Sequence, residues 1–310
     1  MAVRQGWITR LFLVALLVGA AIGLGAIYYW RFRLPESMAN MLRRFPQKDS
    51  VIIQIDLRSL RLANLLEIVA GSPVVEEEEY RRFVHETAFD YRTDLDLVIL
   101  SISGDDRLAL ATGRFDLPAL KKYVMVHGGR CQNGLCSLKN SRGDRYVSFV
   151  PLRSNLVAWA SSKSDSAANQ LMGAAKSADP IAPPSAPFWV KVPRSYWKSS
   201  VEFPSGTKLF AKALEDAEMS YFSVSLDNAL PTATLEAYCA SDSAANSLQT
   251  QLQGMTDVFR KYLERAKEKP NPGDLGSVLT HGIFVQQSNK VVGKWLLEKQ
   301  FLEAMIGGRL

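Results

Sequence analysis

The sequence predicts an α+β fold with an N-terminal transmembrane helix followed by two sheet-and-helix halves. Three observations predict it: an uncharged stretch that begins at Leu11, short apolar strands alternating with amphipathic helices from residue 50 onward, and four prolines within 177–187. The predicted segments are a short cytoplasmic N-terminus 1–10, a transmembrane helix 11–30, a basic juxtamembrane segment 31–48, a first half 49–176, a Pro-rich linker 177–187 and a second half 188–310.

The transmembrane prediction rests on the 20 residues from Leu11 to Trp30, none of which is charged. At about 1.5 Å per residue, such a helix spans the roughly 30 Å hydrocarbon core of a bilayer. The residues predicted to lie at the membrane interface are Tyr28, Tyr29, Trp30, Arg31 and Arg33. The alternative is a cleaved signal peptide, but signal peptides have shorter apolar regions and do not end in aromatic clusters, so we favour a retained signal-anchor.

Small residues form a stripe along the predicted transmembrane helix, at Ala15, Gly19 and Gly23. Such a stripe lets two helix backbones approach closely, which predicts a homodimer through this helix. Small residues that a lipid-facing helix merely tolerates are the alternative.

The net charge of +6 belongs to the N-terminal segment. Residues 1–48 hold seven of the 37 Lys and Arg and one of the 31 acids, so residues 49–310 contain equal numbers of each. This distribution predicts contact with the lipid bilayer and no nucleic acid partner. The charges that flank the apolar stretch would alone place the C-terminal part in the cytoplasm, but long domains translocate largely regardless of charge.

Two cysteines therefore decide the predicted location. Cys131 and Cys136 flank Asn133-Gly134, and Asn-Gly is the strongest short signal for a type I′ hairpin. In that hairpin the two cysteines form a non-hydrogen-bonded pair with Cα atoms about 4.5 Å apart, a separation that a disulfide can bridge. A disulfide predicts a periplasmic or extracellular C-terminal domain and a cytoplasmic N-terminus. Two reduced thiols are the alternative.

Alternating apolar residues and turn signals predict the elements in order. The strands of the first half are expected at 50–57, 95–103, 107–115, 130–138, 145–152 and 156–162, and its helices at 58–71, from Ser72, at 117–126 with Asp116 as N-cap, and near Asp165. The strands of the second half are expected at 188–193, 218–226, 232–241, 282–288 and 290–297, and its helices at 207–217, 248–266 and 301–306.

A shared hexapeptide supports two related halves. The letters SDSAAN occur near residues 164 and 241, each time after a predicted strand and at the start of a predicted helix. We interpret the halves as tandem ferredoxin-like units. The phrases FPQKDSVIIQIDL, FDYRTDLDLVIL and GRFDLPALKKY, behind a single anchor, are similar to uncharacterised single-pass bacterial envelope proteins grouped as domains of unknown function. That resemblance implies a fold and a location but no activity.

Sequence motifs for catalysis or cofactor binding are missing. The chain has no HExxH, GxSxG or GxxxxGK[ST] motif, so no catalytic, metal or cofactor-binding residue and no cofactor is expected. The strongest carboxylate candidates are Asp90, Asp94 and Asp96, with Asp105 and Asp106 as possible neighbours, although acids at alternate strand positions are ordinary.

The leading functional expectation is a membrane-anchored, extracytoplasmic, non-catalytic interaction or structural module whose partner is an envelope protein. The alternative is a domain that binds or senses a small molecule or lipid between the two halves. An enzyme is the least expected class.

Overall fold

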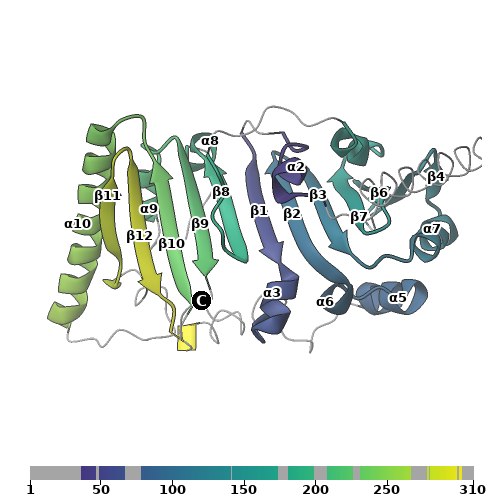
Figure 1. Cartoon of the computed structure of the whole chain (residues 1–310), viewed down its shortest axis with the longest axis horizontal. Coiled ribbons are helices and arrows are strands. Elements are labelled where there is room, and N and C mark those ends of the chain that lie inside the picture. Colours follow the sequence, from purple (N-terminus) through teal and green to yellow (C-terminus); the bar gives the residue numbers. More distant parts are fainter. Residues whose placement is uncertain are drawn as a thin grey trace, which may run out of the picture. The chain divides into compact units, whose positions relative to one another are not determined.

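One antiparallel sheet runs through both predicted halves (Figure 1). A computed structural model describes residues 36–46, 49–66, 78–140, 142–173, 181–198, 208–225, 231–266, 278, 280–298 and 300–301. Its strands are β1 Val51–Asp56, β2 Leu95–Ser103, β3 Asp106–Gly113, β4 Arg130–Gln132, β5 Leu135–Lys139, β6 Tyr146–Arg153, β7 Leu156–Ser162, β8 Phe188–Pro193, β9 Met219–Ser225, β10 Thr232–Tyr238, β11 Ile283–Gln287 and β12 Lys290–Leu296.

The helices in this part of the chain are more numerous than predicted, and several, such as α3 (Leu57–Leu62), are shorter. They are α2 Met38–Leu42, α3 Leu57–Leu62, α5 Glu78–Thr87, α6 Tyr91–Asp94, α7 Leu117–Val126, the 3₁₀ helix η2 Ala167–Leu171, α8 Arg194–Trp197, α9 Lys208–Leu214 and α10 Asp242–Ala266. The chain divides into the units Met1–Asn40 and Met41–Leu310, and the sheet lies wholly in the second unit.

The predicted fold class, a transmembrane helix followed by two α+β halves resembling tandem ferredoxin-like units, is wrong, because the strands form one 12-stranded sheet. The strand order is β11-β12-β10-β9-β8-β1-β2-β3-β7-β6-β5-β4, and within the described residues all pairings are antiparallel. The first strands of the two halves, β1 and β8, pair from Ile52 with Lys191 to Ile55 with Phe188. Their pairing satisfies backbone groups that two separate sheets would leave at open edges.

The two halves nevertheless share a topology within the common sheet. In the first half β1, β2 and β3 form a meander, and the strands after α7 return with β7 beside β3. In the second half β8, β9 and β10 form a meander, and the hairpin after α10 returns with β12 beside β10. The SDSAAN copies do not occupy equivalent places, since the first leads into η2 and the second into α10.

Local sequence signals account for several element boundaries. The helix α7 covers the predicted residues 117–126, and the Asp116 carboxylate accepts a hydrogen bond from the amide of Ala119 at 2.9 Å. The turn between β4 and β5 has positive φ angles at Asn133 (49°) and Gly134 (84°). A disulfide joins Cys131 to Cys136, whose Cα atoms are 4.0 Å apart in facing positions, as the hairpin register predicted.

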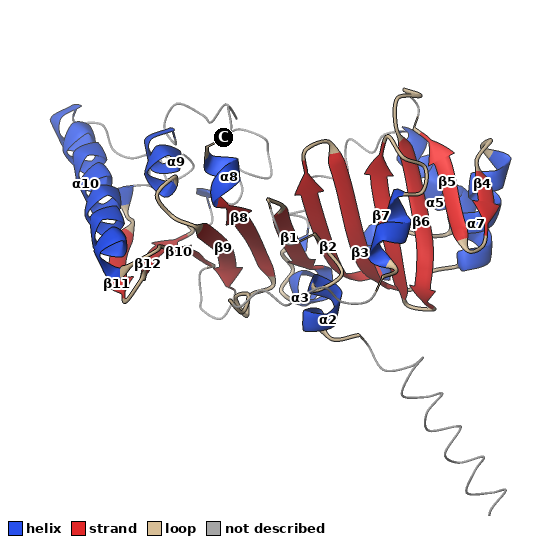
Figure 2. Cartoon of the chain, turned by 90° about the horizontal axis from the view of Figure 1, so that it is seen from above, coloured by secondary structure: helices blue, strands red, loops and turns tan. Residues whose placement is uncertain are grey.

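Helices cover different parts of the two sheet faces (Figure 2). Strand alternation places Leu235 and Ala237 of β10 on the face that shares a core with Leu248 and Leu252 of α10. The opposite face is covered at β6 by η2, where the Ala168 amide donates to the Ser148 hydroxyl at 3.3 Å. The sheet therefore has helices on both faces, and α5 and α7 lie beside the strands of the first half.

The prediction of a membrane-spanning helix is corrected by the helices in the described ranges. None of the helices in the described ranges is long and apolar enough to cross a bilayer. The longest of them, α10, has 25 residues and is amphipathic. The predicted span 11–30, its interface residues and the small-residue stripe lie outside the described residues.

Candidate functional site

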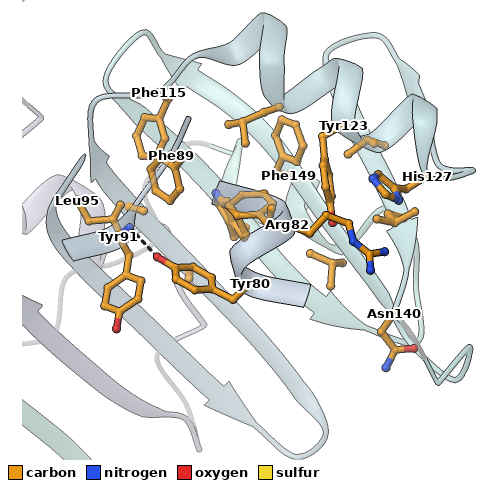
Figure 3. A pocket seen from close by; sticks show the side chains of 18 of the residues that line it. Tyr80, Arg82, Phe89, Tyr91, Leu95, Phe115, Tyr123, His127, Asn140 and Phe149 are labelled. Carbon is orange, nitrogen blue, oxygen red and sulfur yellow. Dashed lines mark hydrogen bonds between the residues drawn. The ribbon is translucent and has the colours of Figure 1, made fainter. Parts of the chain in front are cut away.

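A cavity of about 750 Å³ lies between the helices α5 and α7 and the sheet of the first half (Figure 3). Eight of its 20 lining residues are Phe, Tyr or Trp, and eight more are Leu, Val or Ala. A mostly apolar lining of this size with a few polar groups is typical of small-molecule sites. It lies within residues 80–159 of the first half, whereas the alternative expectation from the sequence was a site between the two halves.

Small side chains on β3 form the floor of the cavity. Ala109 pairs with Trp159 of β7, and Ala111 pairs with Val98 of β2, so these four side chains share one face of the sheet. All four line the cavity. Because a methyl group rises far less above a sheet than an indole, the two alanines leave space between the sheet and the helices.

Aromatic rings from α5, α7 and the segments beside them form the roof and wall. Phe83 of α5 makes edge contacts with Tyr123 of α7 at 5.1 Å and with Phe89 at 6.1 Å between ring centroids. Phe89 stacks on Phe115 at 5.5 Å. Rings in such contacts hold one another in place, so the helices are supported above the small floor residues without descending onto them.

A polar network closes one end of the cavity. The Tyr80 hydroxyl donates to the Asp90 carboxylate at 3.0 Å and accepts from the Tyr91 amide at 3.3 Å (Figure 3). The Arg92 guanidinium donates to the same carboxylate at 2.8 Å. Burial, and then the hydrogen bond to Asp90, raise the pKa of Tyr80 well above its usual value, so the phenol stays neutral at physiological pH.

Asp90 is ionised within this network. Burial opposes its ionisation, but the hydrogen bonds from Arg92 and Tyr80 together outweigh burial and lower the pKa of Asp90. Its carboxylate is therefore fully occupied in holding α6 and the start of α5 together, and it offers no free base.

The opposite end of the cavity carries its polar lining residues. Figure 3 shows Arg82, His127 and Asn140 at the end away from Phe115 and Leu95. His127 Nε2 lies 2.8 Å from Glu86 Oε2, and the Asn140 amide donates to Asp144 at 2.7 Å. Arg82 meets Glu78 only at 4.0 Å, in a pair whose side chains are 55% and 82% exposed.

The second half has an aromatic core between its helices and the sheet. Phe210 of α9 lies 6.3 Å from Phe259 of α10 and 6.4 Å from Phe284 of β11, measured between ring centroids. Together with Leu235 and Trp295 these rings form a continuous core between α9, α10 and the sheet. Two halves of like topology therefore differ among the described residues, since aromatic rings pack together in the second half and line a cavity in the first.

The strongest carboxylate candidates pair with different basic residues, although the Asp90 amide also donates to the Asp94 carboxylate at 2.9 Å. Asp94 pairs with Arg114 at 2.9 Å and Asp96 with Arg61 at 3.0 Å. Asp105 lies at the other end of β2, roughly 27 Å of strand away, and pairs with Lys163. Within the described ranges no group of three or more His, Cys, Asp or Glu is placed to hold a metal ion.

The lining of the cavity was not predicted from the sequence. Six lining aromatics occur between residues 80 and 123, and Ala109 and Ala111 alternate with leucines in β3. The signal available in the sequence was a segment rich in aromatic residues, together with a strand that carries small residues on one face. Of the predicted disulfide and membrane residues, the structure describes Cys131 and Cys136. They pack against Leu120 and Val124 of α7 beside the cavity.

Comparison with known proteins gives a distant structural likeness. The chain matches no protein-family model and no curated protein sequence. Crystal form I of TP0453 aligns with a TM-score of 0.47 and 10% identity over 89% of this chain and 99% of that chain. Crystal form III gives 0.44 and 10% over 87% and 99%, and crystal form IV gives 0.43 and 11% over 87% and 97%.

Proposed function

We propose that this protein binds an apolar small molecule in the cavity under α5 and α7, without catalysis. The observation that carries the proposal is the cavity itself, about 750 Å³ in volume and lined by 16 aromatic or aliphatic residues. Pockets that hold drug-sized ligands have volumes of about 300 to 1,000 Å³ and linings of this kind. The leading expectation from the sequence, an interaction or structural module with a protein partner, stays a prediction.

Burial of apolar surface would favour a ligand at this position. Each methylene group that moves from water into an apolar site contributes about 0.8 kcal/mol. A molecule that covers Trp159 and the alanines of β3 would remove apolar surface of its own and of the protein from water. The polar network at Tyr80 and Asp90 is already satisfied internally, so its groups need no partner from a ligand.

The disulfide supports an oxidising working environment for this binding domain. Disulfides persist in secreted and periplasmic proteins and are rare in the cytosol. Cys131 and Cys136 are joined next to the cavity helix α7, where Cys136 is fully buried. We therefore propose that the ligand is encountered outside the cytoplasm.

Filling the floor of the cavity tests the proposal. We expect Ala109→Phe to lower the affinity for the neutral fluorescent probe N-phenyl-1-naphthylamine by at least about tenfold, because the added ring occupies the ligand's space. The measurement is a fluorescence titration of the full chain, with the thermal unfolding midpoint as a check on folding.

Two further variants keep this test decisive. Ala240→Phe adds the same ring at an exposed position outside the cavity and should leave the affinity unchanged. Val98→Phe fills the floor from β2 in case Ala109→Phe does not fold. Equal affinities for the wild type and both floor variants, or no binding by the wild type, would contradict the proposal.

A further inference from the structure

Arg82 is the charged group at the mouth of the cavity with the weakest attachment to the protein. Its side chain is 55% exposed, and among the described residues its ion-pair partner is Glu78, at 4.0 Å and 82% exposed. An exposed pair at that separation contributes little and separates easily. A guanidinium that is not otherwise committed can donate two parallel hydrogen bonds to a carboxylate or phosphate.

Three other polar residues of the lining, His127, Asn140 and Lys139, contact protein partners. His127 faces Glu86 at 2.8 Å, and its ring also lies 4.3 Å from that of Tyr123. Asn140 uses its amide on Asp144 and accepts from the Arg145 amide at 3.3 Å. The Lys139 ammonium lies over the ring of Tyr146, 5.6 Å from its centroid. Arg82 is therefore the charged lining residue best able to receive a new partner.

The two ends of the cavity differ in polarity. Phe89, Phe115 and Leu95 lie at the end opposite Arg82 (Figure 3). None of the described lining residues is acidic, although Glu78 and Glu86 stand beside the mouth on α5. A ligand with an apolar body and a charged end would thus place its body over the alanine floor and its charged end near Arg82.

We propose that the ligand is an amphiphile with a single anionic group, a carboxylate or a phosphate monoester, which Arg82 binds at the cavity mouth. This inference rests on the proposed function, because it assigns the orientation and charge of a molecule held in the same cavity. Arg82 is a specificity-determining residue in this account, and the apolar floor supplies the remaining affinity.

A ligand series of equal chain length tests the inference. Decanoate, decyl phosphate, decan-1-ol and decyltrimethylammonium are titrated calorimetrically into the full chain at neutral pH. We expect at least one of the two anions to bind about tenfold more tightly than decan-1-ol, and the cation to bind more weakly than the alcohol. Which of the two anions binds tighter identifies the head group.

Neighbouring arginines on α5 supply the matched variants. Arg82→Gln should remove the preference for the anion and leave the affinity for decan-1-ol unchanged. Arg81→Gln, a change at an exposed position outside the lining, should retain the preference. Equal binding of the alcohol and both anions, or equal effects of the two substitutions, would overturn the inference.

The proposed function has its own readout in the same series. Binding of decan-1-ol that Ala109→Phe abolishes shows that the cavity takes an apolar ligand even when no anion preference appears. The anion preference and the binding of an apolar ligand are therefore tested by separate readouts. Absence of binding by all four compounds would overturn both.

Discussion

Asp90 shows how a single partly buried carboxylate stabilises the wall of the cavity. Its side chain is 22% exposed and accepts hydrogen bonds from Tyr80 and Arg92. These bonds lower the pKa of Asp90 against the opposing effect of burial. A folded-state pKa below the unfolded value of about 3.9 means that the stabilisation is complete above about pH 4 and is lost as the pH falls through the folded-state pKa.

Asp90→Asn should therefore lower the free energy of unfolding by about 1 to 2 kcal/mol at neutral pH. The difference from the wild type should shrink as the pH falls below about 4, because the wild-type carboxylate is then protonated. Urea unfolding at a series of pH values measures this difference. Asp105→Asn, whose side chain is 72% exposed, is the control and should change stability little. A difference that does not vary with pH would contradict this assignment.

The helix α10 protects one edge of the sheet. Strand β11 is an edge strand, and its Phe284 carbonyl accepts from Gln249 of α10 at 3.1 Å while its amide donates to Gln253 at 3.4 Å. Figure 1 shows α10 running beside β11. Side chains of the helix thus occupy backbone groups that an open edge would offer to another strand.

Replacing both glutamines by alanine should expose this edge. We expect Gln249→Ala with Gln253→Ala to produce concentration-dependent self-association, because Phe284 then presents an unpaired amide and carbonyl. Light scattering after size-exclusion chromatography measures the mass of the particles. Gln251→Ala, at an exposed position of the same helix, should remain like the wild type. A double variant with an unchanged mass at every concentration would show that these contacts do not protect the edge.

Elements defined by local signals were predicted well. Asp116 and the periodicity that follows determine α7, and Asn133-Gly134 determines the register that brings Cys131 to Cys136. The predicted helix near Asp165 is the short 3₁₀ helix η2 instead. A capping residue can start a helical turn, but the length of the helix depends on tertiary packing that a capping signal does not contain.

At the scale of the whole molecule, the features that depend on long-range contacts were not predicted from the sequence. The pairing of β1 with β8 joins residues near 52 to residues near 191, and no local periodicity specifies it. The cavity likewise depends on α5 and α7 standing above Ala109 and Ala111 of a distant strand. Repeated topology was visible in the order of elements, but the common sheet and the packing difference between the halves were not.

Hydrogen exchange measured by mass spectrometry, with and without N-phenyl-1-naphthylamine, tests whether an apolar ligand binds between α5, α7 and the sheet. A ligand between α5, α7 and the sheet stabilises the elements that it contacts, so amide exchange reports its position. The account predicts slower exchange in α5 and α7 on addition of the probe and no change in α10. Unchanged exchange in α5 and α7 at a saturating probe concentration, or protection confined to the second half, would contradict it.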